Sequence, residues 1–157
     1  GVGGTNTPAV SAYMSSSQTV SDNTSTKVQY NTELYDTASA YDNSSNYRFT
    51  VPSGQAGKYF IHASCYMFGN NNDEKNFEIE IHLNGSAVRR DFRSHAGYTT
   101  SLTSGGNDDI TAILDLSVSD YIEIFAKIDV NSGTPSFYGN ASAANRYSIL
   151  EIFKLVE

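Results

Sequence analysis

The histidines are the first side chains in this chain that could do chemistry, because imidazole binds zinc and transfers protons near neutral pH. His62, His82 and His95 lie on three separate segments, without the short spacing that zinc ligands usually show. We therefore expect no zinc site. If His62 is repeated around a threefold axis, its protonation would bring like charges together and make the assembly sensitive to pH.

Acidic loops are the second group of residues that could do chemistry, here as ligands of a metal ion. Carboxylate and amide oxygens gather in residues 70–74, in residues 107–109 and at Asp129. These are hard ligands of the kind that calcium prefers, but none of the stretches has the ligand order of an EF-hand loop. Calcium is therefore the one cofactor that the sequence leaves open, with three candidate ligands: Asp73, Asp108 and Asp109.

Catalysis is not indicated. The sequence contains no Gly-x-Ser-x-Gly nucleophile motif. Glu78 and Glu80 form a carboxylate pair of the type that glycosidases use, but they alternate with apolar residues, as side chains on the wet face of any sheet do. We expect a protein that is not an enzyme.

Charge and composition argue against several classes of partner and of structure. The 157 residues include 10 Lys and Arg against 17 Asp and Glu, so a net charge of −7 argues against a nucleic-acid partner. No apolar run approaches the roughly 20 residues of a membrane helix, and no signal peptide opens the chain. The single cysteine, Cys65, excludes an internal disulfide.

The elements that carry these residues are predicted to be strands. Residues 77–83 alternate strictly between apolar and polar side chains, and Asn84-Gly85 follows at once as a two-residue hairpin turn. Further strands are expected from residue 9 and over residues 58–68, 87–93, 110–118, 121–128 and 147–156. Turn clusters at residues 52–54, 69–72, 104–107 and 131–133 separate them.

The last segment, residues 147–156, also fits a helix face, but its β-branched and aromatic residues favour a strand. The pattern predicts a single β-sandwich domain over residues 9–157, preceded by a flexible arm over residues 1–8.

Several expected strands are apolar on both faces. In residues 58–68, Tyr59, Ile61 and Cys65 alternate with Phe60 and Tyr66. One face of a sandwich strand packs on the other sheet, so the second apolar face needs another cover. Another subunit would supply it.

Four segments resemble the C1q signature: Tyr41-Asp42 with residues 47–52, Gly57-Lys58-Tyr59-Phe60-Ile61, residues 115–122, and Tyr147-Ser148-Ile149-Leu150. Ile61, Ser119 and Ile149 depart from the Phe, Gly and Gly that the family has there. The resemblance implies a ten-stranded, all-β antiparallel jelly roll of the C1q and tumour-necrosis-factor (TNF) type, assembled as a compact homotrimer. It also adds support for calcium, which some C1q-like trimers hold near the apex.

The resemblance assigns residues to two surfaces. The trimer would be built on the inner sheet, with five residues at its interface: Phe60, His62, Ile113, Tyr147 and Ile149. Both chain ends would lie at the base, and the connections over residues 69–76, 94–107 and 131–145 at the apex. Those loops are rich in Asn, Ser, Gly and Tyr, which suits polar recognition with aromatic anchors. The candidate apex residues are Asp73, Glu74, Tyr98, Asp108, Asp109, Phe137 and Tyr138.

Two functions fit these expectations. The first is a structural protein on a particle surface, such as a phage or viral capsid decoration protein or a fibre head, attached through the arm. The second is a secreted, extracellular recognition module that binds a glycan or a receptor through the apex loops.

Overall fold

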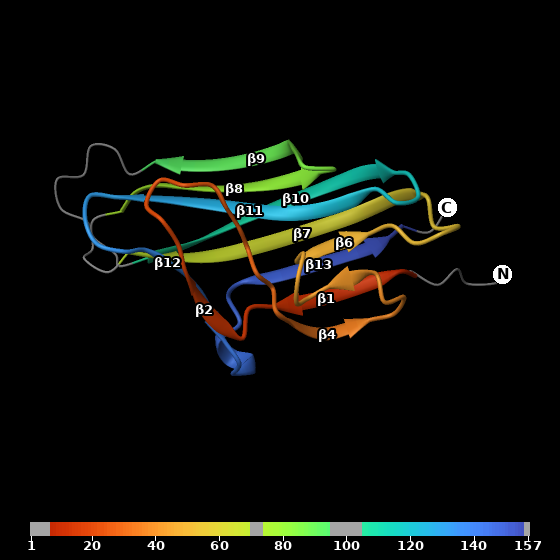
Figure 1. Ribbon diagram of the computed structural model, residues 1–157, viewed down its shortest axis with the longest axis horizontal. Coiled ribbons are helices and arrows are strands. Elements are labelled where there is room, and N and C mark those ends of the chain that lie inside the picture. The colour runs from red at the N-terminus through yellow and green to blue at the C-terminus, as the bar shows by residue number, and fades with distance from the viewer. Residues whose placement is uncertain (1–6, 70–73, 95–104, 156–157) are drawn as a thin grey trace.

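The computed structural model describes residues 7–69, 74–94 and 105–155, which form two antiparallel β-sheets packed face to face (Figure 1). The first sheet contains β1 (Ala9–Tyr13), β2 (Ser16–Thr19), β4 (Thr32–Asp36), β7 (Gly57–Phe68), β10 (Gly105–Leu116), β12 (Ser136–Asn140) and β13 (Ile149–Lys154). The second contains β3 (Thr26–Lys27), β5 (Tyr41–Asp42), β6 (Arg48–Thr50), β8 (Glu74–Leu83), β9 (Ser86–Ser94) and β11 (Tyr121–Val130). A short 3-10 turn, η1, covers Ala143–Asn145. In the described part of the chain, no helix has the length and apolar character needed to cross a membrane.

Ten of these strands form a regular pair of five-stranded sheets. Their orders are β4-β1-β13-β7-β10 and β5-β6-β11-β8-β9, and β2, β12 and β3 are added at the margins. The all-β, antiparallel sandwich expected from the sequence is confirmed, and so is the strand at the C-terminal end of the chain.

The β8–β9 hairpin is confirmed at the predicted turn. Asn84 and Gly85 have φ angles of 52° and 81°. Two consecutive positive φ angles are the signature of the type I′ turn, whose twist matches that of the flanking strands. This turn fixes the register of β8 and thereby decides which of its side chains face the core.

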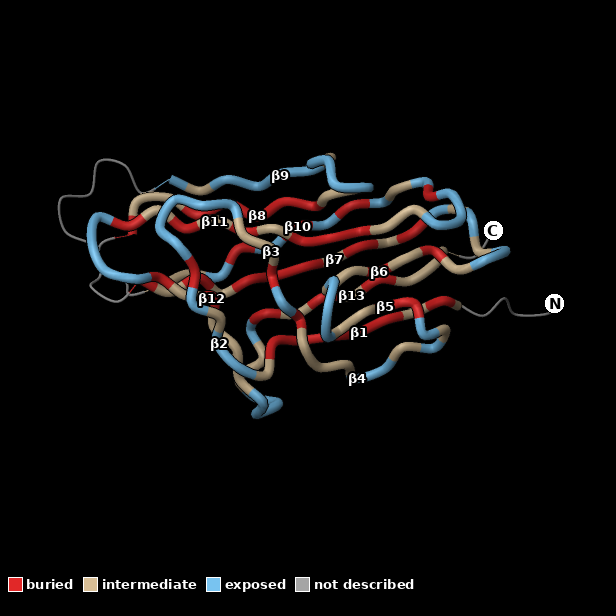
Figure 2. Tube along the Cα trace, viewed as in Figure 1, coloured by how far each residue is buried: buried red, intermediate tan, exposed pale blue. Residues whose placement is uncertain are grey.

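The core lies between the sheets, as the buried segments in Figure 2 show. On β7, the inward side chains Tyr59, Ile61, Ala63, Cys65 and Met67 are all completely buried. Burial between the sheets raises the pKa of Tyr59 to about 12 and raises that of the Cys65 thiol well above its usual value. The alternation on this strand therefore predicted the core face correctly.

One expected turn and one expected connection are wrong in part, because strands occupy some of their residues. Gly105 and Gly106 belong to β10, opposite Phe68 and Met67 of β7, where the sequence predicted a turn over residues 104–107. A Cβ on Gly105 would lie 2.7 Å from the Met67 carbonyl oxygen, so glycine permits close backbone approach here. Within the expected apex connection over residues 131–145, residues 136–140 form β12, which pairs with β2 and β7.

The first and last strands of the chain meet at one end of the sandwich, as expected. Ala9 at the start of β1 lies opposite Phe153 near the end of β13, whereas the end of β7 and the start of β10 meet at the other end (Figure 1). Pro8 is buried, and its carbonyl accepts a hydrogen bond from the Lys154 amide at 3.0 Å. Pro8, which was expected to belong to the flexible arm, is thus held against the end of the sheet.

Candidate functional site: the outward face of the seven-stranded sheet

The outward face of β7, β10 and β13 carries an apolar strip. Phe60 lies opposite Ile113 on one side and Phe153 on the other. The Phe60 and Phe153 rings stack with centroids 5.0 Å apart, and Ile113 is 58% exposed. These residues face away from the core because they alternate with buried neighbours on each strand. The strip is therefore apolar surface that the single chain leaves uncovered.

His62 adds a polar group next to this strip. Its Nδ1 lies 3.2 Å from the Thr111 hydroxyl on β10, and Glu151 lies opposite it on β13. Thr111 and Glu151 are therefore the polar neighbours of His62 on the two adjacent strands.

Tyr147 and Ile149 occupy the next part of the same face. The buried Ser64 hydroxyl donates to the Tyr147 carbonyl at 2.7 Å, and the Ile149 amide donates to the Ser64 oxygen at 3.3 Å. Ser64 therefore fixes the backbone of both residues against β7. All five expected interface residues lie on this one face, but whether a trimer forms through them stays a prediction.

The expected apex residues that the structure describes do not form one surface. Phe137 is fully buried in the core cluster, so its proposed role as an exposed aromatic anchor is wrong. Glu74 is also buried, and its Oε1 accepts a hydrogen bond from the Gly69 amide at 3.2 Å. Tyr138 is half-buried on β12. Asp73 and Tyr98 lie outside the described residues.

The calcium candidates are separated by strand geometry. Asp108 is buried and forms an ion pair with Arg93 at 2.7 Å, whereas Asp109 is exposed on the opposite face of β10. Adjacent strand residues point to opposite faces, so these two carboxylates cannot converge on one ion. Within residues 7–69, 74–94 and 105–155, no group of three or more His, Cys, Asp or Glu side chains could hold a metal ion.

The motif residues of the C1q resemblance have clear structural roles. The Tyr41 hydroxyl donates to the buried Tyr30 carbonyl at 3.1 Å. The Asp42 carboxylate accepts backbone hydrogen bonds from Ser44, Ser45 and Asn46, which lower its pKa well below the ordinary value. The Tyr-Asp pair thus connects the core to a turn that the carboxylate organises.

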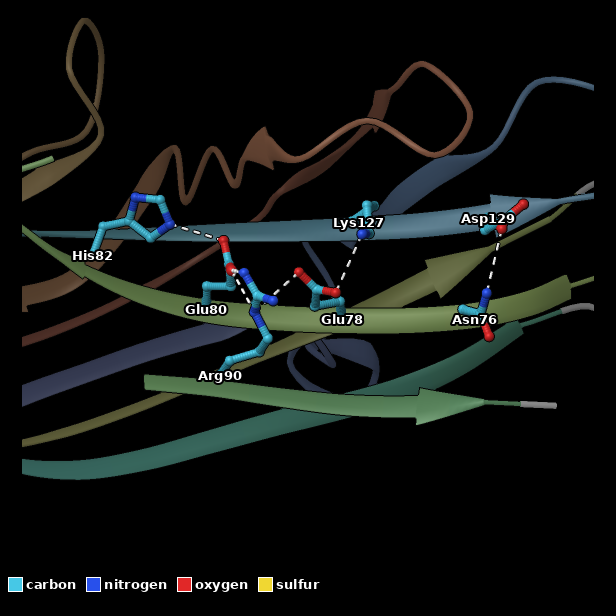
Figure 3. A network of polar contacts seen from close by, with 7 residues as sticks. All are labelled: Asn76, Glu78, Glu80, His82, Arg90, Lys127 and Asp129. Atoms are coloured by element: carbon cyan, nitrogen blue, oxygen red, sulfur yellow. Dashed lines mark hydrogen bonds and ion pairs between the residues drawn. The ribbon is translucent and has the colours of Figure 1, made fainter. Parts of the chain in front are cut away.

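The outward face of the other sheet is charged (Figure 3). Arg90 Nε lies 2.7 Å from a Glu80 oxygen and 3.3 Å from a Glu78 oxygen, and Lys127 contacts Glu78 at 3.2 Å. Burial alone would raise the pKa of Glu80, but hydrogen bonds from His82 and Arg90 outweigh it and lower that pKa. The two glutamates are therefore held in ion pairs along this face.

A hollow of about 440 Å³ opens beyond the apolar strip, between the end of β7 and the strands β2 and β12. Tyr66, Tyr138 and Tyr147 surround it with their rings. Alternation placed Tyr66 on the outward face, but nothing in the sequence predicted that Tyr138 would join it. That arrangement depends on the unexpected pairing of β12 with β7.

No protein-family model and no curated protein matches this sequence. Solved structures do match its fold. The chain is similar to Eiger, a TNF of S. frugiperda, with 13% identity and a TM-score of 0.67 over 95% of this chain and 92% of that one. It is also similar to the globular domain of the zebrafish complement 1qA protein, with 15% identity and a TM-score of 0.61 over 96% of this chain and 98% of that one. The fold is therefore the C1q/TNF-like jelly roll that the sequence motifs predicted.

Proposed function

We propose that this chain is a non-enzymatic binding module that assembles as a homotrimer through the outward face of its seven-stranded sheet. The observation that carries the proposal is the apolar strip of Phe60, Ile113 and Phe153. Burial of such a strip between subunits stabilises an assembly by roughly 25 cal/mol for each Å² of apolar surface removed from water. The likeness of the fold to a TNF and to a C1q domain supports a trimer.

The charge distribution supports this face over the opposite one. The outward face of the six-stranded sheet carries the Glu78, Glu80 and Lys127 ion-pair network. Covering those groups would require desolvation of several charges, which is costly unless a partner compensates each of them. The strip of Phe60, Ile113 and Phe153 itself contains no charged side chain. Its charged neighbours on the same face are the exposed Lys58–Asp115 pair, Asp109 and Glu151.

Light scattering at micromolar concentration tests the assembly. A trimer would have a mass of about 51 kDa, three times the 17.1 kDa of the chain. A mass of one subunit across this concentration range would reject the proposal.

We place the trimer on a particle surface, as a phage or viral capsid decoration protein or a fibre head. Because β1 starts and β13 ends at the same end of the sandwich, three N-terminal segments would leave one end of the trimer together. Three weak contacts made jointly bind much more tightly than one, so these segments could fasten the trimer to a threefold site.

A second candidate is an extracellular recognition module. The tyrosine-lined hollow supports it, because an aromatic concavity with nearby hydroxyl groups is a typical ligand site. The two candidates differ in what the N-terminal segment is needed for: only the first requires it for attachment.

A further inference from the structure

The hollow beyond the apolar strip has the properties of a ligand site. Its volume of about 440 Å³ falls within the roughly 300–1,000 Å³ of small-molecule sites. Six of the described residues line it: Ser17, Tyr66, Phe68, Ser136, Tyr138 and Tyr147. They come from β2, β7, β12 and the segment before β13, so the tertiary fold brings them together.

The three tyrosine rings pack against one another as a fixed aromatic wall. Tyr66 lies edge-on to Tyr138 with centroids 5.7 Å apart, and it lies 5.6 Å from Tyr147. The Tyr138 and Tyr147 centroids are 6.0 Å apart. These separations lie within the range in which aromatic pairs stabilise each other, so each ring limits the rotation of the other two.

Two buried serines hold the backbone beneath this wall. The Ser148 hydroxyl donates to the Tyr138 carbonyl at 2.7 Å and accepts a hydrogen bond from the Tyr66 amide at 3.0 Å. Ser64 in turn donates to the Tyr147 carbonyl. All three tyrosines are therefore tied to buried hydroxyl groups, and a site held in advance loses less entropy when a ligand binds.

Among the described residues, the lining contains aromatic rings and hydroxyl groups but no charged side chain. The faces of tyrosine rings are electronegative, and they attract the weakly positive C–H groups on the flat face of a sugar ring. Serine and tyrosine hydroxyls donate and accept hydrogen bonds and therefore match sugar hydroxyls. The net charge of −7 disfavours an anionic ligand.

We propose that this hollow binds a neutral carbohydrate, with a pyranose ring stacked on Tyr138 or Tyr147. The site deepens the second function above but needs only the residues of one subunit. In a trimer built on the apolar strip, Tyr147 would also approach the neighbouring subunit, and the sugar would then bind at the margin of the interface.

The first test uses saturation-transfer NMR on the full chain with the methyl glycosides of glucose, galactose, mannose and N-acetylglucosamine. We expect at least one of them to receive saturation and to show a Kd by titration. The methyl glycoside of glucuronic acid is the anionic comparison and should bind more weakly. Absence of transfer to all four neutral glycosides, or preference for the anionic sugar, would overturn the proposal.

Variants then locate the site. Tyr138→Ala should weaken glycoside binding at least about tenfold, the equivalent of 1.4 kcal/mol, whereas Tyr138→Phe should retain most of it because the ring remains. Tyr35→Ala is the matched control, since Tyr35 is a 52% exposed tyrosine on β4, outside the lining. Equal loss in Tyr138→Ala and Tyr35→Ala, or no loss in either, would contradict the assignment.

Light scattering and thermal melting of the same samples keep the failures apart. A folded trimer that binds no glycoside would reject the sugar site and leave the proposed assembly standing. A monomer that binds a glycoside through Tyr138 would reject the proposed assembly and leave the sugar site standing.

Discussion

Arg93 on β9 and Asp108 on β10 form an ion pair across the open edge of the sandwich, with Nη2 and Oδ1 2.7 Å apart, although the two strands belong to different sheets. The Arg93 guanidinium also lies 5.0 Å from the centroid of the Phe77 ring. Asp108 is buried, so the pair replaces water around a carboxylate that the fold has enclosed. It joins the two sheets at the side where β9 and β10 are the outermost described strands.

Arg93→Ala should therefore destabilise the fold by about 2–3 kcal/mol, because it leaves the Asp108 carboxylate buried without its guanidinium partner. Arg89→Ala is the matched control on the same strand, since Arg89 is exposed and donates a hydrogen bond to the carbonyl of its neighbour Val88. Urea unfolding measures both. Equal effects of the two substitutions would show that the pair contributes nothing specific.

Phe60→Glu should dissociate the trimer and leave the subunit folded. It would bring three carboxylates together within an apolar interface, where desolvation and mutual repulsion both oppose assembly. Tyr59→Glu should instead prevent folding, because Tyr59 is completely buried. Phe92→Glu, at a 53% exposed position on β9, is the control for a new surface charge and should leave the trimer intact. Circular dichroism and light scattering distinguish the three results, and similar behaviour of the Phe60 and Phe92 variants would contradict the interface.

Glu80→Gln should reduce the acid sensitivity of the fold. The folded-state pKa of Glu80 lies below its ordinary value of 4.5, so its ion pairs stabilise the protein fully above about pH 4.5. That contribution is lost as the pH falls from 4.5 through the lower folded-state pKa. The variant should melt at a lower temperature than the parent at pH 7, and the difference should shrink toward pH 3. A difference that is constant over this range would contradict the role of ionised Glu80.

Ser119→Gly should raise the stability by about 0.5–1 kcal/mol. Ser119 has a φ of 72°, where a Cβ is unfavourable by roughly 1–2 kcal/mol and glycine is not. The greater freedom of glycine in the unfolded chain offsets part of the gain. The Ser119 amide would still donate to the Val51 carbonyl at 3.0 Å. Chemical denaturation would show the increase, and an unchanged or lower midpoint would mean that the serine is not strained.

Deletion of residues 1–7 should leave the melting temperature and the proposed trimer unchanged and abolish the proposed attachment to a particle. Pro8 is kept, because its carbonyl accepts the hydrogen bond from Lys154. Sedimentation of the protein with the particle measures attachment, and replacement of residues 1–7 by an unrelated glycine-serine segment of equal length is the control. Normal binding by the truncated protein would remove the N-terminal segment from the attachment mechanism.

Local patterns in the sequence determined the sheets and their faces. Alternation assigned Tyr59 and Ile61 to the core and Phe60 to the outward face, because successive strand residues point in opposite directions. The Asn84-Gly85 turn was equally predictable, since a type I′ hairpin needs two residues that tolerate positive φ. Such features depend on neighbours along the chain.

Only the tertiary structure decided how distant segments meet. Glycine is common in turns, but Gly105 lies in a strand, where it lets β10 approach β7 closely. Phe137 was expected in a loop, but the pairing of β12 with β7 buries it and brings Tyr138 beside Tyr66 and Tyr147. The contacts of β10 and β12 with β7 join residues tens of positions apart. Their free energy depends on the register and packing of whole strands, which local alternation does not encode.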